Sequence, residues 1–90
     1  MDVGCGNLDF IKYLRNRYQN IDIEGVDLSN QNSIPDIKFI KADFVSYQDF
    51  KQYDYVYSIM TIEHIDKISQ FAQKLYSIVK PGGHLIITTI

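Results

Sequence analysis

Residues 1–10 read MDVGCGNLDF, and this stretch decides which fold the rest of the chain can form. A short segment, residues 1–3, has the pattern of a strand and runs into Gly4 and Gly6. From Leu8 onward the apolar residues recur at helical spacing. Glycine has no Cβ, so the backbone of this turn can adopt a positive φ and approach a ligand closely. A strand that ends in such a turn and leads into a helix presents free backbone N–H groups at the start of the helix.

Strand and helix patterns alternate along the remainder of the chain. Strands are predicted at residues 1–3, 21–27, 37–41, 55–60 and 85–90, and helices at 8–19 and 67–79. The sequence Pro81-Gly82-Gly83 is predicted to form a turn that ends the second helix, with His84 in the same turn. Strands that alternate with helices predict an α/β fold with a parallel sheet and helical crossovers.

An acidic residue, Asp27, ends the second predicted strand and follows Gly6 by 21 residues. In parallel α/β sheets, ligands bind beyond the carboxyl ends of the strands. A carboxylate at that position can accept hydrogen bonds from both hydroxyls of a ribose. The glycine turn, the helix and the strand-end acid, in this order, therefore predict a nucleoside pocket.

Composition excludes several other classes of function. The 90 residues carry a net charge of −2 and no basic cluster, so there is no nucleic-acid signature. A single cysteine, Cys5, rules out an internal disulfide, and we expect it to fill space in the turn. The two histidines, His64 and His84, have no ligand partners at metal-site spacing, so we expect no metal site. The sequence shows no signal peptide and no apolar run long enough for a membrane span, so we expect a cytoplasmic protein.

Five segments resemble the motifs of one family, the class I S-adenosylmethionine-dependent methyltransferases. In order, they are DVGCGN (2–7), EGVDLS (24–29), IKADF (40–44), YDYVYSIMTIEHI (53–65) and VKPGGHLIITT (79–89). The fourth segment is similar to the family pattern FDxVxxxxxLEHI, and the fifth to LKPGGxLxI. The resemblance runs in order over essentially the whole chain. It implies a Rossmann-like parallel sheet in the order 3-2-1-4-5 and S-adenosylmethionine as the cofactor.

The resemblance also implies roles for individual residues. Asp2, Gly4 and Gly6 would border the methionine part of the cofactor, and Asp27 would bind the ribose. Leu28 would lie against the adenine, Asp43 would bind the adenine amino group, and Phe44 would lie beside it. The floor near the sulfonium would be lined by residues 58–60, which begin with Ser58 and end with Met60. The family often has a third glycine where this chain has Leu8, and we expect Leu8 to turn into the helix core because it fits the apolar stripe.

Two residues after the fourth strand, Glu63 and His64, are the candidates for a catalytic role. The ordinary pKa of histidine, near 6.5, suits a general base. The alternative, which we favour, is that this pair caps or braces the following helix. The tyrosines at 53, 55 and 57 are compatible with a base-stacking surface, but alternating strand positions more often indicate core packing.

The functional hypothesis is a methyltransferase that moves a methyl group to a small-molecule acceptor by direct displacement. The alternative is a non-catalytic or truncated methyltransferase-like domain. A nicotinamide-dependent dehydrogenase fragment fits less well, because the GxGxxG motif needs glycine where the chain has Asp9.

The predicted first strand is short although it should be the centre of the sheet, and the fifth strand ends with the chain. We therefore expect residues 1–90 to be a partial cofactor-binding domain. It would be truncated before the last two strands of the family sheet, inactive alone, and prone to aggregate through the edge of its fifth strand.

Overall fold

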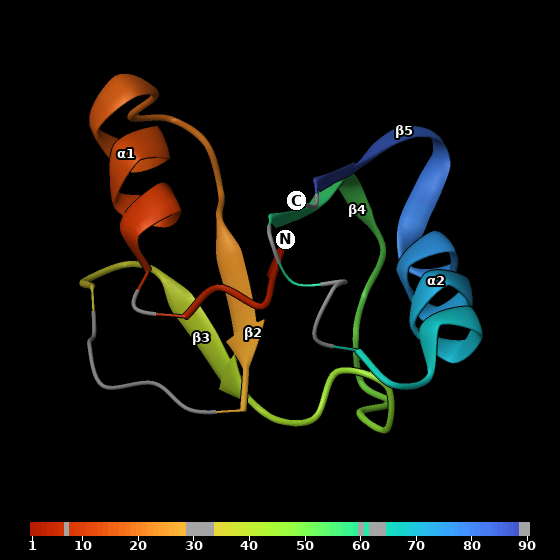
Figure 1. The fold of residues 1–90 in the computed structure, drawn as a ribbon. Helices are drawn as coiled ribbons and strands as arrows, with labels where there is room; N and C mark the ends of the chain where they lie inside the picture. Colours follow the sequence, from red (N-terminus) through yellow and green to blue (C-terminus); the bar gives the residue numbers. More distant parts are fainter. Residues whose placement is uncertain (7, 29–33, 60, 62–64, 89–90) are drawn as a thin grey trace.

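The computed structural model describes residues 1–6, 8–28, 34–59, 61 and 65–88. Five strands and two helices follow one another along the chain (Figure 1). Their bounds are β1 (Asp2–Val3), α1 (Asp9–Arg17), β2 (Glu24–Asp27), β3 (Lys38–Lys41), β4 (Tyr53–Ile59), α2 (Ile68–Ser77) and β5 (Val79–Thr88). Neither helix is long and apolar enough to cross a membrane, within the residues that were described.

All five strands form one parallel sheet in the order β3-β2-β1-β4-β5, which confirms the predicted order. Strand β1 has only two residues, yet it lies between β2 and β4 at the centre of the sheet. Its Asp2 is in register with Gly25 of β2 on one side and with Tyr57 of β4 on the other. Figure 1 shows β2 and β3 side by side and pointing the same way.

The two helices cover opposite faces of the sheet. Strand residues alternate between the two faces, so one sheet contributes side chains to two separate core clusters. One core cluster packs Phe71 and Leu75 of α2 against Val3, Val26 and Val56 of the central strands. The other packs Leu8 and Ile11, at the start of α1, with Cys5 and Ile23. Helices α1 and α2 accordingly lie on opposite sides of the sheet in Figure 1. The predicted α/β fold with a parallel sheet is therefore confirmed, and a helix lies on each face of the sheet.

The turn predicted at Pro81-Gly82-Gly83 is wrong, because these residues lie inside β5. Helix α2 ends at Ser77, and Val79 already pairs with Tyr53 of β4. The register then shifts before Tyr55 pairs with His84, so His84 is a strand residue and not a turn residue. Proline is tolerated here because β5 is an edge strand, and Gly82 takes a φ of 82° that a bulge requires.

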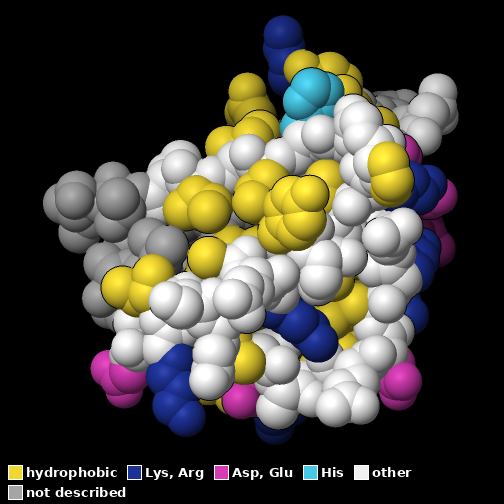
Figure 2. Space-filling model, turned by 90° about the vertical axis from the view of Figure 1, so that its right-hand side faces the viewer, with side chains coloured by type: hydrophobic (Ala, Val, Ile, Leu, Met, Phe, Trp, Pro, Cys, Tyr) yellow, Lys and Arg dark blue, Asp and Glu magenta, His cyan; other side chains and the backbone are white. Residues whose placement is uncertain are grey.

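The outer edge of the sheet is apolar and exposed. Leu85, Ile86 and Ile87 of β5 are 36, 51 and 39% exposed. Figure 2 shows hydrophobic side chains gathered on this side of the molecule, close to a histidine side chain. An uncovered edge of this kind, without charged residues from His84 to Thr88, can pair with another chain.

Candidate functional site

The glycine turn leaves β1 at the carboxyl edge of the sheet. Gly4 and Gly6 have φ values of 79° and 54°, the left-handed region that glycine adopts without strain. The backbone N–H groups of Gly4 and Cys5 both donate to the carbonyl of Val26, at 2.8 and 3.2 Å. A Cβ built on Gly6 would meet no atom within 4 Å, so this side of the turn is open to a ligand.

Leu8 occupies the position where the family often has a third glycine. Its backbone takes the conformation of a glycine, while its side chain is buried as expected for a leucine. Its φ is 72°, the left-handed conformation of a glycine, and it stands immediately before α1. Its side chain is 1% exposed and packs in the cluster beneath α1. The expectation that Leu8 turns into the helix core is therefore confirmed.

Asp27 ends β2 next to this turn. Its Oδ2 accepts a 2.8 Å hydrogen bond from the backbone N–H of Gly6. The carbonyl of Asp27 accepts a bond from Ala42, which ties the ends of β2 and β3 together at 2.9 Å. Leu28, the next residue, is 68% exposed and has an apolar surface available for a planar ligand. The two residues assigned to the ribose and the adenine thus lie at one edge with the glycine turn.

Asp2 contributes a carboxyl group that is only 3% exposed. Burial raises the pKa of Asp2 to about 7; the amino terminus opposes this shift, and the charge of Asp27 adds to it. Asp2 and its register partner Tyr57 lie on the same face of the sheet, against α1. The Tyr57 hydroxyl is buried and has no hydrogen-bond partner among the described residues, and burial together with Asp2 raises the pKa of that phenol.

Asp43 and Phe44 follow β3 and diverge in their environments. Asp43 is exposed, and its carboxylate accepts hydrogen bonds from the Ser46 hydroxyl at 3.1 Å and the Val45 backbone N–H at 3.4 Å. The ring of Phe44 is 7% exposed and lies 5.4 Å from that of Phe71 in α2. Its side chain belongs to the core, so Phe44 can face an adenine only through its backbone.

The carboxyl end of β4 holds the residues that were expected to line the floor of the site. Ser58 is fully buried, and its hydroxyl finds no hydrogen-bond partner within the part of the chain that the structure describes. It points to the α2 face, opposite Tyr57, because the two are neighbours in a strand. Thr61 follows β4 and contacts the glycine turn. Three assigned residues, Met60, Glu63 and His64, lie outside the described residues.

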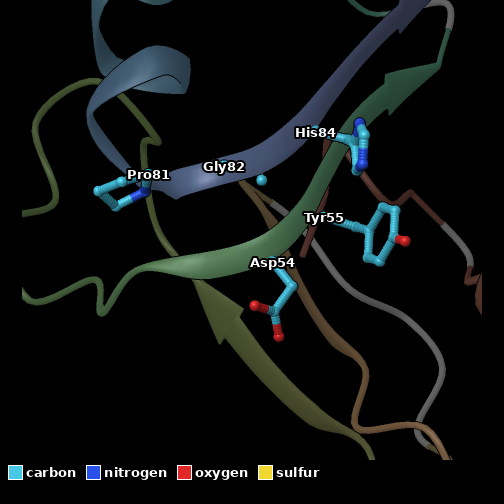
Figure 3. A pocket seen from close by; sticks show the side chains of 6 residues that line it. Asp54, Tyr55, Pro81, Gly82 and His84 are labelled. Carbon is cyan, nitrogen blue, oxygen red and sulfur yellow. The ribbon is translucent and has the colours of Figure 1, made fainter.

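A separate hollow lies at the other end of the sheet. It measures about 270 Å³ and is lined by Asp54, Tyr55, Pro81, Gly82, Gly83 and His84. Figure 3 shows Tyr55 and His84 projecting together from neighbouring strands, with ring centroids 5.2 Å apart. These residues begin β4 and the paired part of β5, so the hollow lies away from the glycine turn. Among the residues that the structure describes, no three His, Cys, Asp or Glu side chains form a metal site.

Sequence reasoning missed the part that two residues play near this edge: Thr61, which contacts the glycine turn, and Tyr57, which lies beside Asp2. The alternation in β4 placed Tyr57 on a sheet face, but nothing in the pattern predicted a buried hydroxyl without a partner. Thr61 stands in a motif position that carries no fixed residue in the pattern FDxVxxxxxLEHI. The remaining predicted residues that the structure describes lie at the ends of β1, β2, β3 and β4, which a parallel sheet places on one edge.

Comparisons with known proteins match essentially the whole chain to methyltransferases. A family model described as a methyltransferase domain matches residues 1–90. A malonyl-[acyl-carrier protein] O-methyltransferase of Ilyobacter polytropus is 29% identical over 98 residues, which cover 99% of this chain and 38% of the relative. A ubiquinone biosynthesis O-methyltransferase of Rickettsia bellii is 30% identical and covers all of this chain and 41% of the relative. The chain thus spans about two fifths of the length of these relatives.

Solved structures share the fold at lower identity. The plantazolicin methyltransferase BpumL, in complex with a pentazolic desmethylPZN analog and SAH, superposes with a TM-score of 0.85 at 18% identity. That match covers 99% of this chain and 37% of BpumL. The DhpI-SAM-HEP complex superposes with a TM-score of 0.79 at 16% identity and covers 99% of this chain. At these identities the superpositions show that the fold is shared.

Proposed function

This chain belongs to the methyltransferase-domain family, and we propose that it binds S-adenosylmethionine at the carboxyl edge of its sheet, as the cofactor-binding core of a methyltransferase. The observation that carries the proposal is the hydrogen bond from Gly6 to Asp27. It brings the open glycine turn and the strand-end carboxylate together within 2.8 Å. A nucleoside that is linked to an amino acid needs both features in one place.

The residues at this edge fit the chemistry of the cofactor. Asp27 is placed to accept the ribose hydroxyls, and the exposed surface of Leu28 suits an adenine face. Asp43, beyond β3, offers a carboxylate to the adenine amino group. The cofactor carries an ammonium group, and the buried carboxyl of Asp2 beside the turn is a counterion for it.

An acidic residue at the start of α1 argues against a phosphate-bearing cofactor. Asp9 is the first residue of α1, where a dinucleotide fold would hold a pyrophosphate against the helix N-terminus. A carboxylate at that point repels a pyrophosphate, whereas S-adenosylmethionine has no phosphate. We therefore retain the methyltransferase over the dehydrogenase fragment.

The chain's own contribution to the reaction would be binding and orientation. When bound, S-adenosylmethionine would supply a methyl group on a sulfonium, from which a neutral thioether is a good leaving group. Holding the acceptor and the methyl group in line would then supply most of the rate effect. We propose a small-molecule acceptor, since the net charge of −2 offers no basic surface for a nucleic acid. A role for Glu63 or His64 as a base remains a prediction.

Calorimetry with S-adenosylhomocysteine tests the proposal directly. The parent chain should bind it, with a 1:1 stoichiometry, and NADH at the same concentration should give no heat of binding. An acceptor screen with labelled S-adenosylmethionine follows only when binding is shown. If the folded chain binds no S-adenosylhomocysteine at millimolar concentration, the proposal is wrong.

A further inference from the structure

Thr61, just beyond β4, lies directly against the glycine turn. A Cβ built on Gly4 would fall 2.8 Å from the Thr61 methyl carbon Cγ2 and nearer still to its hydroxyl oxygen. The space that a side chain at position 4 would need is therefore taken by Thr61. The Thr61 hydroxyl lies 3.2 Å from the carbonyl oxygen of Ile59 and 3.5 Å from that of Val3. Val3 is the last residue of β1 and immediately precedes the turn.

The opposite side of the turn is held by β2. Gly4 and Cys5 donate to the Val26 carbonyl, and Gly6 donates to Asp27. The turn is thus fixed between the end of β2 and the end of β4. On the β4 side, the contact that the structure describes is made by Thr61.

A glycine turn needs such support because glycine loses more conformational freedom on ordering than any other residue. A ligand that binds to the backbone of a loose turn must pay for ordering it, and its affinity falls accordingly. A side chain packed on Gly4 orders the turn before the ligand arrives. Among the described side chains, Thr61 is the one that meets a Cβ built on Gly4, and neither Tyr57 nor Ser58 does.

We propose that Thr61 is a positioning residue for the cofactor, acting through Gly4 to hold the glycine turn in its binding geometry. The inference rests on the proposed function for its effect on the cofactor. Its structural half, that Thr61 orders the turn, stands independently of any ligand. The methyl group fills the space above Gly4, and the hydroxyl bonds a backbone carbonyl at the end of β1 or β4.

The test compares Thr61→Ala and Thr61→Ser with the matched control Ser77→Ala. Ser77 in α2 also donates its hydroxyl to a backbone carbonyl, that of Lys74 at 2.7 Å, but it ends α2 beside Gln52, just before the start of β4 and not at its carboxyl end. Two quantities are measured in the full chain: amide hydrogen exchange at Gly4, Cys5 and Gly6 without ligand, and affinity for S-adenosylhomocysteine.

Thr61→Ala should speed exchange at the three turn amides and weaken S-adenosylhomocysteine binding about fivefold, the effect expected for one lost hydrogen bond. Thr61→Ser, which keeps the hydroxyl, should recover part of both losses. Ser77→Ala should change neither quantity, although it loses a comparable bond. General destabilisation would lower the melting temperature of both Thr61→Ala and Ser77→Ala. Only Thr61→Ala should also show faster exchange at the turn amides and weaker binding.

A reciprocal pair probes the contact itself. Gly4→Ala should weaken binding because its methyl group collides with Thr61, and Gly4→Ala combined with Thr61→Gly should recover part of the loss. Recovery stays partial because alanine at a φ of 79° is strained.

Unchanged exchange at the turn in Thr61→Ala would overturn the positioning role, whatever the cofactor does. Faster exchange with unchanged affinity would overturn its importance for the cofactor. A parent chain that binds no S-adenosylhomocysteine would overturn the proposed function and this cofactor role, while the exchange experiment still decides whether Thr61 orders the turn.

Discussion

The backbone N–H of Gly6 donates to Oδ2 of Asp27, so the glycine turn and the end of β2 form one unit across 21 residues of sequence. Asp27→Ala removes this bond and, with it, the carboxylate that we propose as the acceptor for the ribose hydroxyls. Losing a charge-assisted hydrogen bond costs about 1.5 to 3 kcal/mol of binding. Affinity for S-adenosylhomocysteine, measured by calorimetry, should therefore fall roughly ten- to hundredfold.

Asp54→Ala is the matched control for Asp27→Ala. Asp54 is the second residue of β4, at the opposite end of the strand from the site, where its 75% exposed side chain lies 3.6 Å from Lys80. Its removal should leave the affinity unchanged. Equal affinities in Asp27→Ala and the parent would show that Asp27 does not anchor the ribose.

Asp2 should make stability and cofactor binding respond to pH in opposite directions. Its pKa is raised to about 7 from an ordinary value of 3.8, so the folded chain holds a proton that the unfolded chain releases. The stabilising contribution is complete below pH 3.8 and is lost as pH rises through about 7. Binding of an ammonium group favours the ionised carboxylate, so affinity should fall as pH drops below about 7.

Asp2→Asn separates these effects from other titrations. The variant should lose most of the pH dependence of S-adenosylhomocysteine affinity between about pH 6 and 8.5, and it should be less destabilised than the parent toward the alkaline end. Calorimetry and thermal unfolding across this range measure the two. An affinity profile in Asp2→Asn as steep as that of the parent would assign the titration to another group.

Glu24 should make the fold sensitive to acid. Its carboxylate accepts a 2.7 Å hydrogen bond from the Tyr53 hydroxyl and pairs with Lys51 at 2.8 Å. Burial acts to raise the pKa of Glu24, but the bonds from Lys51 and Tyr53 outweigh it and leave the pKa below the ordinary 4.5. The stability that this lowered pKa gives is present above pH 4.5 and is lost as pH falls through the folded-state value.

Urea unfolding at about pH 5 and pH 3 should therefore show a larger loss of unfolding free energy in the parent than in Glu24→Gln. Tyr53→Phe, which removes one donor, should lie between them. If the parent and Glu24→Gln lose stability equally over this interval, the pair with Lys51 does not carry the acid sensitivity.

The sheet order and the site edge could be predicted because they follow from rules about parallel strands. Alternating elements and crossover topology limit the arrangement, and the ends of parallel strands share one edge. Strand lengths were harder. The second strand was predicted at 21–27, but β2 is confined to Glu24–Asp27 because its partner β3 begins only at Lys38, opposite Glu24. A strand's length depends on where its neighbour starts, which local pattern does not record.

Contacts between distant parts of the chain could not be predicted from the local sequence either. Pro81-Gly82 has the local pattern of a turn, and only the unpaired outer edge of β5 allows these residues to form a bulge within a strand. Phe44 follows Asp43 in a motif, but its ring packs in the core against the rings of Phe50 and Phe71. Thr61 is an ordinary residue in sequence, and its contact with Gly4 exists only because β4 ends beside β1.

The exposed edge of β5 should govern self-association. Ile86→Lys places a charge on a strand whose segment from His84 to Thr88 has no Lys, Arg, Asp or Glu, and charged side chains on edge strands block pairing with other chains. Ile86 is 51% exposed, so the substitution should cost little folding free energy. Light scattering against concentration should show less association than in the parent. Tyr76→Lys, at a 79% exposed position of α2, adds the same charge away from the edge and should have a smaller effect.

Position 8 should reverse the ranking of alanine and glycine that holds inside a helix. Removing a buried leucine side chain costs about 2 to 5 kcal/mol, so Leu8→Ala and Leu8→Gly should both destabilise the fold, since Leu8 is 1% exposed. The backbone decides their order: at a φ of 72°, alanine carries left-handed strain of about 1 kcal/mol that glycine does not. Leu8→Gly should therefore unfold at a higher urea concentration than Leu8→Ala. Within α1 the opposite holds, and Lys12→Gly should be about 1 kcal/mol less stable than Lys12→Ala. If glycine were the weaker residue at both positions, residue 8 would not hold the left-handed conformation of the glycine that it replaces.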